Sequence, residues 1–350
     1  MLIQAGPQVA SVFAHDIAAE LMALGTFRTG PVLQQAFLGR LARLAHVQAL
    51  QHPIVLRVGL PETAILGEDL AGKFNDVDGV DDGHATNFGM ILLNRGGGRW
   101  YLQPMCLIVL AYKVHPLYPL IVAANRDEFR SRPALAARFW EDAPMILAGR
   151  DQRAGGTWLG ISQAGRFAAL TNHRDLRRAP RRGPSRGAVV LQALKRGNHA
   201  DTPSMYDGFN LIHGPVDALR YHNNIEPTDT VLAPGIHGLS NAFLNTRWPK
   251  VEAARTAMQR IIGTAGTDLA EGLFAMLTND AVAPDHALPD TGLPTTMERM
   301  LSSIFITGPD YGTRCSTVLL VGQNGEVYFE ERSWPVGDRQ VFTFNLLSQR

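Results

Sequence analysis

The stretch MCLIVLAYKVHPLYPLIVAANRDE, residues 105–128, decides the fold of this chain. Its two apolar runs, 106–112 and 120–124, have the length of buried β-strands and are too short for typical helices. The connector between them holds two prolines, which suits a turn. The stretch therefore predicts a hairpin of two buried strands that ends in four consecutive polar residues, NRDE at 125–128.

The pattern after this hairpin predicts strands first, then helices, then strands again. The expected strands are 158–162, 166–171, 209–213, 218–222, 316–321, 325–332 and 340–345. The expected helices are 187–196, 249–262 and 267–278. This order is typical of an α+β protein with antiparallel sheets and segregated helices, rather than of a parallel sheet with alternating strands and helices.

The composition fits a globular protein and argues against two classes. Of 350 residues, 45% are apolar and 19% are charged, which is enough apolar material for a large core. Lys plus Arg number 33 and Asp plus Glu number 32, so the net charge is +1 and nothing indicates a nucleic-acid partner. No uncharged apolar stretch reaches about 18 residues, so we expect no membrane insertion.

The two cysteines, Cys106 and Cys315, are too few for a disulfide framework and fit a reducing compartment, so we expect a cytoplasmic protein. Spacings typical of metal sites, such as CxxC and HExxH, are absent, and so are the P-loop and the GxSxG nucleophile motif. We therefore expect no metal and no resident cofactor. The sequence does not determine the oligomeric state.

The first 104 residues differ in character from the rest. Residues 11–50 carry apolar residues at helical spacing, 75–83 are rich in Asp and Gly, and 96–98 are three glycines typical of a flexible linker. We therefore divide the chain into an N-terminal segment, 1–104, and a domain at 105–350.

The pair Met105-Cys106 suggests a nucleophile. A Met followed by a small residue is the type of start from which Met is removed, and a chain that begins at Cys106 carries a thiol and an α-amine on one residue. An α-amine, with an ordinary pKa of about 7.7–8.0, suits a general base at neutral pH, and the thiol beside it suits a nucleophile. The alternative is an inert cysteine in a buried strand.

Other polar residues end or follow apolar segments. Arg126 and Asp127 can hold a fixed charged constellation, or they can simply end a solvated strand. Asn172 and Asn241 follow apolar segments, where an amide can donate a hydrogen bond to a developing oxyanion or can serve a turn or cap. Arg314 precedes the apolar strand at 316–321.

Seven blocks of this sequence, taken in order, resemble the NRDE family, the family of the transport and Golgi organisation protein 2. The blocks, which lie between 105 and about 344, are MCLIVLAY, HPLYPLIVAANRDEFRSRP, GGTWLGIS with GRFAALTNHR, YDGFNLI, PGIHGLSNAFLNTRWPK and YGTRCSTVLLV. That family is similar to N-terminal nucleophile hydrolases such as penicillin V acylase and bile salt hydrolase. The resemblance implies a four-layer αββα sandwich, with two antiparallel sheets between helices.

The resemblance also assigns a site. Its residues are Cys106, Arg126, Asp127, Asn172, Asn241 and Arg314. The cysteine matches the nucleophile, and the Arg-Asp pair matches the residues that orient it and its amine. The asparagines match the oxyanion-binding and amine-binding residues, and the last arginine matches a late arginine of the acylases. Arg and Asp are adjacent here but separated in the acylases, so their individual roles stay open.

Two functions follow from the resemblance. The first is a cysteine amidohydrolase that acts on the C–N amide bond, or an ester bond, of a small molecule. The second is a non-catalytic carrier of haem or a lipid-like ligand, as animal family members are linked to haem trafficking, lipid metabolism and Golgi organisation. The candidate haem ligands are the cysteines and His115, His173 and His237.

Two segments carry open alternatives. Nothing in residues 1–104 resembles the family, which leaves three alternatives for this segment. Translation starts at Met105, or the segment is a propeptide that is removed before Cys106, or it stays attached and blocks the amine of Cys106. The basic stretch 174–186 holds six arginines and two prolines, and is expected to be a solvated surface loop or a lid that attracts an anionic substrate.

Overall fold

The computed structural model describes residues 90–93, 99–102, 105–178, 183–197, 205–263 and 267–347. Within the expected N-terminal segment, only a hairpin is described, in which β1 (Met90–Leu93) pairs antiparallel with β2 (Arg99–Leu102). The helices expected in 11–50 lie outside the described residues, as does the rest of 1–104.

Two antiparallel sheets form the centre of the domain that follows. The six-stranded sheet contains, in spatial order, β12 (Gly235–Leu239), β3 (Met105–Tyr112), β4 (Leu120–Phe129), β13 (Tyr311–Val321), β14 (Glu326–Ser333) and β15 (Arg339–Asn345). The seven-stranded sheet contains β11 (Thr228–Val231), β10 (Arg220–Asn223), β9 (Phe209–Pro215), β8 (Arg166–Asn172), β7 (Leu159–Ser162), β6 (Ala143–Asp151) and β5 (Ala134–Trp140). The predicted hairpin at 105–128 is confirmed as β3 and β4.

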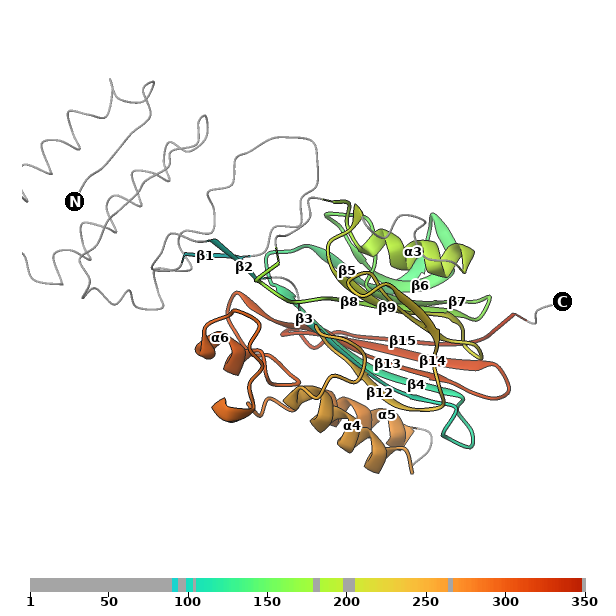
Figure 1. The fold of residues 1–350 in the computed structure, drawn as a ribbon. Helices are drawn as coiled ribbons and strands as arrows, with labels where there is room; N and C mark the ends of the chain where they lie inside the picture. Colours follow the sequence, from blue (N-terminus) through green and yellow to red (C-terminus); the bar gives the residue numbers. More distant parts are fainter. Residues whose placement is uncertain are drawn as a thin grey trace, which may run out of the picture. The chain divides into compact units, whose positions relative to one another are not determined.

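Helices cover the outer faces of both sheets (Figure 1). The helix α3 (Gly187–Arg196) packs on the seven-stranded sheet, and α4 (Pro249–Ile261) and α5 (Thr267–Leu277) pack on the six-stranded sheet. A 3₁₀ turn (Asp285–Ala287) and the short helix α6 (Thr295–Met300) lead into β13. The expected α+β class and four-layer αββα arrangement are confirmed.

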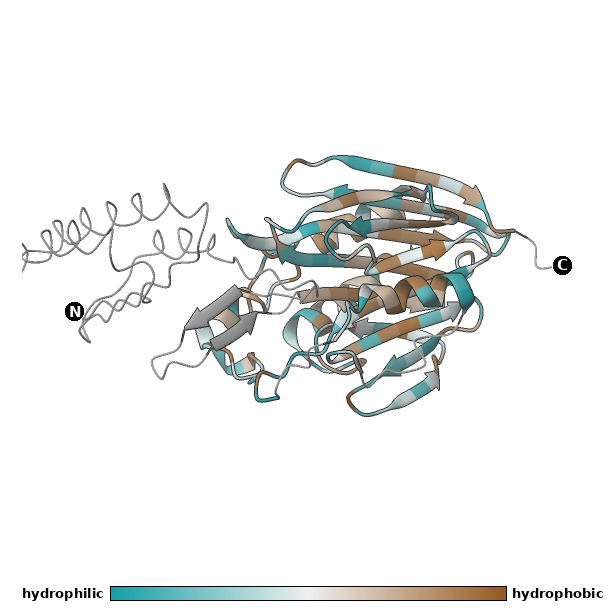
Figure 2. Cartoon of the chain, turned by 90° about the horizontal axis from the view of Figure 1, so that it is seen from above, coloured by the Kyte–Doolittle hydropathy of each residue, from teal (hydrophilic) through white to brown (hydrophobic). Residues whose placement is uncertain are grey.

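Strand β3 is apolar on both faces because both faces are covered. Ile108 and Leu110 lie in the core between the two sheets, and Leu107 and Val109 lie in the core under α4 and α5. A strand covered on both sides reads as a continuous apolar run, which is why the hairpin can be recognised in the sequence. Figure 2 shows the hydrophobic residues along the central strands and the hydrophilic ones toward strand ends and loops.

The same alternation divides the four polar residues that end β4. Successive side chains of a strand point to opposite faces, and Ala124 belongs to the core between the sheets. Arg126 and Glu128 therefore face the space between the sheets. Asn125 and Asp127 face the helix layer, where the Asn125 amide donates to backbone carbonyls at the end of α5 and ahead of β13.

The sequence does not predict the strands β1, β2, β5, β6, β11 and β12, or the helix α6. Strand β11 is exposed on every residue, so it has no apolar pattern to recognise. Strands β5 and β6 pair with irregular register, which interrupts the period of two that marks a strand. In the described part of the chain, no helix has the length and apolar character needed to cross a membrane.

Candidate active site

A cavity of about 410 Å³ lies at one end of the sandwich, where β3 begins and β4 ends. Its polar lining includes Cys106, Arg126, Glu128, Arg132, Asp151, Asn172, Arg186, Arg314, Cys315 and Glu331. Its apolar lining includes Leu135, Trp158, Leu170, Trp334 and Val336. A concave site with apolar walls and a few convergent polar groups is typical of a small-molecule site.

The thiol of Cys106 stands in the cavity wall at the head of β3, and the residue is 6% exposed. Burial raises the pKa of the Cys106 thiol to about 12, and the charge of Asp127 acts in the same direction, whereas Arg126 lowers it. Here Cys106 is joined to Met105 by a peptide bond, within one strand. In this joined state the thiol is protonated at neutral pH and is a poor nucleophile.

Arg126 occupies the centre of the cavity wall. In the sheet it lies opposite Cys106 on one side and Cys315 on the other. Its guanidinium lies 3.4 Å from Glu128, which is also 3.6 Å from Arg132. These charges alternate along the wall, so each buried ion has a partner of opposite sign.

Arg314 fixes the turn that follows β4. Its Nη1 donates to the carbonyl oxygens of Phe129, Arg130 and Arg132 at 2.7, 3.1 and 3.0 Å. It stands at an irregularity in the register between β13 and β4, and such bulges re-aim a side chain. Burial lowers the pKa of Arg314, and the nearby charge of Arg126 adds to this.

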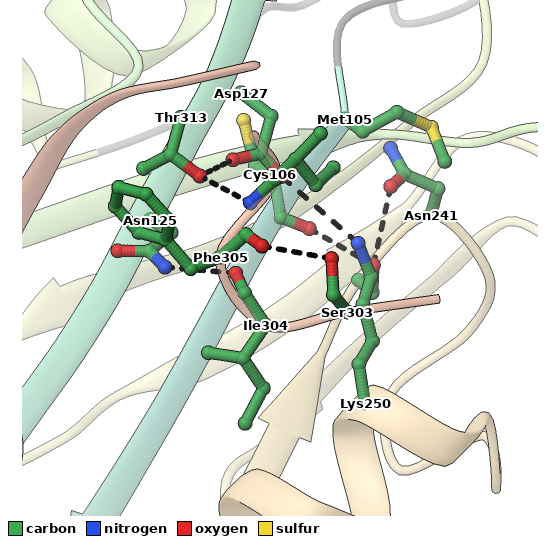
Figure 3. Close-up of polar contacts among 12 residues, drawn as sticks. Met105, Cys106, Asn125, Asp127, Asn241, Lys250, Ser303, Ile304, Phe305 and Thr313 are labelled. Carbon is green, nitrogen blue, oxygen red and sulfur yellow. Dashed lines mark hydrogen bonds and ion pairs between the residues drawn. The ribbon is translucent and has the colours of Figure 1, made fainter. Parts of the chain in front are cut away.

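Asp127 lies on the other face of β4 and is not among the lining residues of the cavity. Figure 3 shows it beside Thr313 and facing Lys250. It is fully buried, and its Oδ1 accepts a hydrogen bond from the Thr313 hydroxyl at 2.7 Å. Its Oδ2 has no hydrogen-bond partner among the described residues and lies 4.0 Å from the Nζ of Lys250 on α4. Burial raises the pKa of Asp127 to about 7, and the charge of Lys250 opposes that rise.

The two asparagines occupy different positions. Asn172, at the end of β8, lines the cavity, and its backbone carbonyl accepts a 2.9 Å hydrogen bond from the side chain of Asn241. Asn241 is fully buried and is not part of the cavity lining. The neighbouring Ser240 hydroxyl lies 2.9 Å from the carbonyl oxygen of Cys106 and 3.1 Å from the Asn241 side-chain oxygen. Ser240 and Asn241 therefore link the start of β3 to the end of β8.

The structure thus brings four of the six expected site residues to one cavity and places two elsewhere. The cavity residues are Cys106, Arg126, Asn172 and Arg314. Asp127 and Asn241 are fully buried and are not among the lining residues, and Asp127 faces Lys250 of α4. Lys250 and Thr313 are not predicted from the sequence, although both fall in the blocks TRWPK and YGTRC, because a lysine at a helix start and a threonine in a strand carry no chemical signal.

The candidate haem ligands of the carrier hypothesis are not all gathered in the cavity. Of the candidate haem ligands, Cys106 and Cys315 line the cavity, and His115, His173 and His237 are not among its lining residues. Within the described ranges, no group of three or more His, Cys, Asp or Glu residues is arranged to hold a metal ion.

The basic stretch 174–186 is not a surface loop throughout. Arg174 is 4% exposed and pairs with Glu298 at 2.8 Å, and Arg186 is 5% exposed and donates to the Gly208 carbonyl at 3.0 Å. The prediction of a solvated loop is wrong for these two residues, because distant segments supply their partners. It holds for Arg177 and Arg178, whose side chains are mostly exposed, and residues 179–182 lie outside the described part.

Comparison with known proteins places the chain in a family. The family model of Transport and Golgi organisation 2 matches residues 105–335. The chain belongs to this family. A bovine Transport and Golgi organization protein 2 homolog is 39% identical over 259 residues, which cover 65% of this chain and 93% of that protein. The human homolog is 37% identical over 258 residues, with the same coverage.

The Transport and Golgi organisation 2 match contains all six expected site residues and begins at Met105. The Drosophila melanogaster Transport and Golgi organization protein 2 is 27% identical over 261 residues, covering 65% of this chain and 92% of that protein. Among solved structures, a mutant conjugated bile acid hydrolase from Clostridium perfringens is 8% identical with a TM-score of 0.32, covering 69% of this chain and 92% of that one.

Proposed function

We propose that this protein is a cysteine N-terminal nucleophile amidohydrolase, which cleaves the C–N amide bond, or an ester bond, of a small molecule. The observation that carries the proposal is the position of Cys106. Its thiol stands at the head of a central strand, in the wall of a cavity that also presents the Arg126 guanidinium and Asn172. Both cysteines are free thiols, in keeping with work in a reducing compartment such as the cytoplasm.

The proposed active form begins at Cys106. A peptide nitrogen offers no proton acceptor, and burial raises the pKa of the joined thiol to about 12. Release of Met105 and all that precedes it supplies an α-amine with an ordinary pKa of about 7.7–8.0. The family match begins at Met105, one residue ahead of the nucleophile, which supports this start.

The reaction uses the amine as base and acid in turn. The neutral α-amine takes the thiol proton, and the thiolate forms a C–S bond with the substrate carbonyl carbon. In this scheme Asn172, in the cavity wall, donates through its amide to the resulting oxyanion, a contact worth about 3 kcal/mol in comparable sites. Collapse breaks the C–N bond, and the leaving nitrogen takes the proton of the α-ammonium.

Water completes the cycle by the same route. It attacks the thioester while the α-amine accepts its proton. The C–S bond then breaks, the acid leaves, and the sulfur regains its proton. Arg126 contributes by favouring the thiolate, since its charge lowers the pKa of Cys106.

The test uses protein made from the full-length gene. Intact mass identifies the first residue, and iodoacetamide followed by peptide mapping identifies the alkylated thiol. We expect Cys106 as the first residue and as the main site of alkylation, with hydrolysis of N-acyl amides or esters that Cys106→Ala abolishes and Cys315→Ala retains. Persistence of Met1, or preferential alkylation of Cys315, would refute the proposal.

Two observations favour the alternative function, that of a carrier. The apolar part of the cavity lining could hold a flat hydrophobic ligand, and the names of the animal relatives refer to transport. Haem would then have Cys106 or Cys315 as its ligand, because these are the candidate ligands in the lining. Haemin titration followed by absorbance tests this. Absence of binding at micromolar haemin removes the carrier function for haem.

A further inference from the structure

Lys250 is a buried cation in an unfavourable place. It is the second residue of α4, directly after Pro249, and is 2% exposed. Its Nζ has no hydrogen-bond partner among the described residues. Burial of an ammonium that, within the described part of the chain, makes no hydrogen bond and has one ion-pair contact, at 4.0 Å, is costly, and the positive end of the helix dipole makes the start of a helix a poor site for a cation. Such a residue calls for a reason beyond stability.

The side chain of Lys250 is aimed at an equally incomplete acceptor. Figure 3 shows it extending from α4 toward Asp127, beside the start of β3. The two atoms that face each other, Lys250 Nζ and Asp127 Oδ2, are 4.0 Å apart and both lack a hydrogen-bond partner among the described residues. Thr313 satisfies only the other carboxylate oxygen. The pair therefore has unused capacity for one more polar group.

The start of β3 lies beside this pair. In the β3–β4 ladder Asp127 is opposite Met105, and Arg126 is opposite Cys106. The nitrogen of Cys106 thus lies between these two rungs. The Met105 side chain is fully buried with Ile306 and Tyr311 on the helix side of the sheet, the same side that Asp127 faces, so its departure empties space there.

We propose that Lys250 is the positioning residue for the α-amine of Cys106: together with Asp127 it receives the amine on the helix side of the sheet, and its charge keeps that amine neutral. This inference rests on the proposed function. The amine donates to the free Oδ2 of Asp127, and the ammonium of Lys250 opposes a second positive charge beside it. The lone pair of the amine then stays available for the thiol proton.

The charges around Lys250 leave this effect intact. Burial is the largest influence and lowers the pKa of Lys250, whereas the charge of Asp127 from β4 raises it. Smaller influences come from Arg174, in the segment after β8, which lowers the pKa, and from Cys106 on β3 and Glu298 on α6, which raise it. Arg174 and Glu298 form their own 2.8 Å ion pair, so their effects largely cancel. The hydroxyl of Tyr311, from β13, accepts a hydrogen bond from the Met105 N–H at 2.7 Å. It is uncharged at neutral pH, because burial raises its pKa well above the ordinary value.

Removal of Lys250 and removal of Asp127 should move the pKa of the amine in opposite directions. A nearby cation favours the neutral amine and a nearby anion favours the charged amine. Lys250→Met therefore raises the pKa of the amine, and Asp127→Asn lowers it. Two unit charges about 5 Å apart at an effective dielectric constant of about 20 change each other's pKa by about two, so we expect the amine pKa to rise by about one or more in Lys250→Met.

The test measures the amine directly. Mature protein is prepared from the full-length gene in a Cys106→Ala background, so that acylation cannot divert to the thiol. Trace acetic anhydride is added over a range of pH, and the acetylated N-terminal peptide is quantified by mass spectrometry. Lys250→Arg, which keeps the charge, is the matched variant and should restore the reference midpoint to within about 0.3 pH unit.

The same change appears in turnover where the nucleophile is intact. Because the base must be neutral, the acidic limb of the pH–rate profile moves to higher pH in Lys250→Met by as much as the amine pKa rises. If the limb moves by about one pH unit, the rate at any pH below it falls about tenfold. An amine midpoint unchanged in Lys250→Met, or lowered by it, overturns the inference. If Lys250→Met fails to fold, Asp127→Asn decides, because the inference predicts a lower amine midpoint in that variant. An amine midpoint that is unchanged in Asp127→Asn also overturns the inference.

Failure of the proposed function looks different. If residue 106 is never the first residue, even in protein that keeps Cys106, no α-amine exists at that position, and the N-terminal nucleophile mechanism itself is refuted. If residue 106 is the first residue and the amine midpoint is unchanged only in Lys250→Met, the hydrolase proposal stands without a role for Lys250.

Discussion

Replacement of Thr313 by valine tests the support of the buried carboxylate. Thr313 is fully buried, and its hydroxyl donates to Asp127 Oδ1 at 2.7 Å while it accepts the Ile306 N–H at 2.9 Å. Valine has nearly the same shape, so Thr313→Val removes the hydroxyl and leaves both partners buried. The substitution therefore isolates two hydrogen bonds from packing.

The expected loss of stability follows from these two bonds. A hydrogen bond to a charged group contributes about 1.5–3 kcal/mol, and an unsatisfied buried N–H costs about 1–3 kcal/mol. Because the two effects are not additive, we expect a loss of about 3 kcal/mol. At about 2–4 °C per kcal/mol for a domain of this size, the thermal midpoint falls by about 6–12 °C.

The control is Thr230→Val on the exposed strand β11, which should change stability by less than about 0.5 kcal/mol. Both variants are compared with the parent by thermal unfolding at one scan rate. A drop for Thr313→Val no larger than that of the control contradicts the two hydrogen bonds of the Thr313 hydroxyl.

The pH dependence of the same variant gives a second criterion. Burial raises the folded pKa of Asp127 to about 7, well above its unfolded value. A raised folded pKa means that the folded state binds the proton more tightly, so this stabilising contribution is full at acid pH and is lost as pH rises toward 7. Loss of the Thr313 donor raises that pKa further. The destabilisation should therefore be greater above pH 7 than below pH 6, and the reverse order would refute the assignment.

Two further substitutions test buried polar contacts outside the cavity. Arg174→Met leaves Glu298 buried without its cation and should lower the free energy of unfolding in urea by about 3–5 kcal/mol. Arg177→Met, at a mostly exposed pair, should lower it by under about 1 kcal/mol, and equal effects would contradict the buried pair. Asn125→Ala removes two 2.8 Å donations to buried carbonyls and should cost about 2–4 kcal/mol by the same measurement, and a neutral result would show that water replaces the amide.

The sequence predicts the covered parts of this fold better than its edges. The hairpin at 105–128 is recognisable because both faces of β3 and β4 are buried, and the helices at 249–262 and 267–278 are placed to within a residue because each has one apolar side. The exposed strand β11 has no such pattern. Secondary structure is predicted from the pattern of apolar residues, and burial is what produces that pattern, so exposed or irregular strands are not predicted.

The candidate site divides in the same way. Cys106, Arg126 and Arg314 are predictable from local blocks, and the structure places them in one cavity. Lys250 is not, because its importance depends on α4 packing over β3, a contact between segments far apart in the chain. The burial of Arg174 has the same origin, since its partner Glu298 belongs to α6. Local sequence patterns do not predict pairings between residues of distant segments.

The alternation of β4 explains why two charged residues stand side by side at its end. An N-terminal nucleophile needs its sulfur on the substrate side of the sheet and, in the form we propose, its nitrogen held from the helix side. The neighbouring strand β4 can contact both the sulfur and the nitrogen only if its successive residues point to opposite faces of the sheet. Arg126 points toward the cavity, and Asp127 points toward Lys250 and Thr313. Exchange of the two residues, Arg126→Asp with Asp127→Arg, keeps the composition and reverses both faces, and should abolish Cys106 reactivity even in protein that folds.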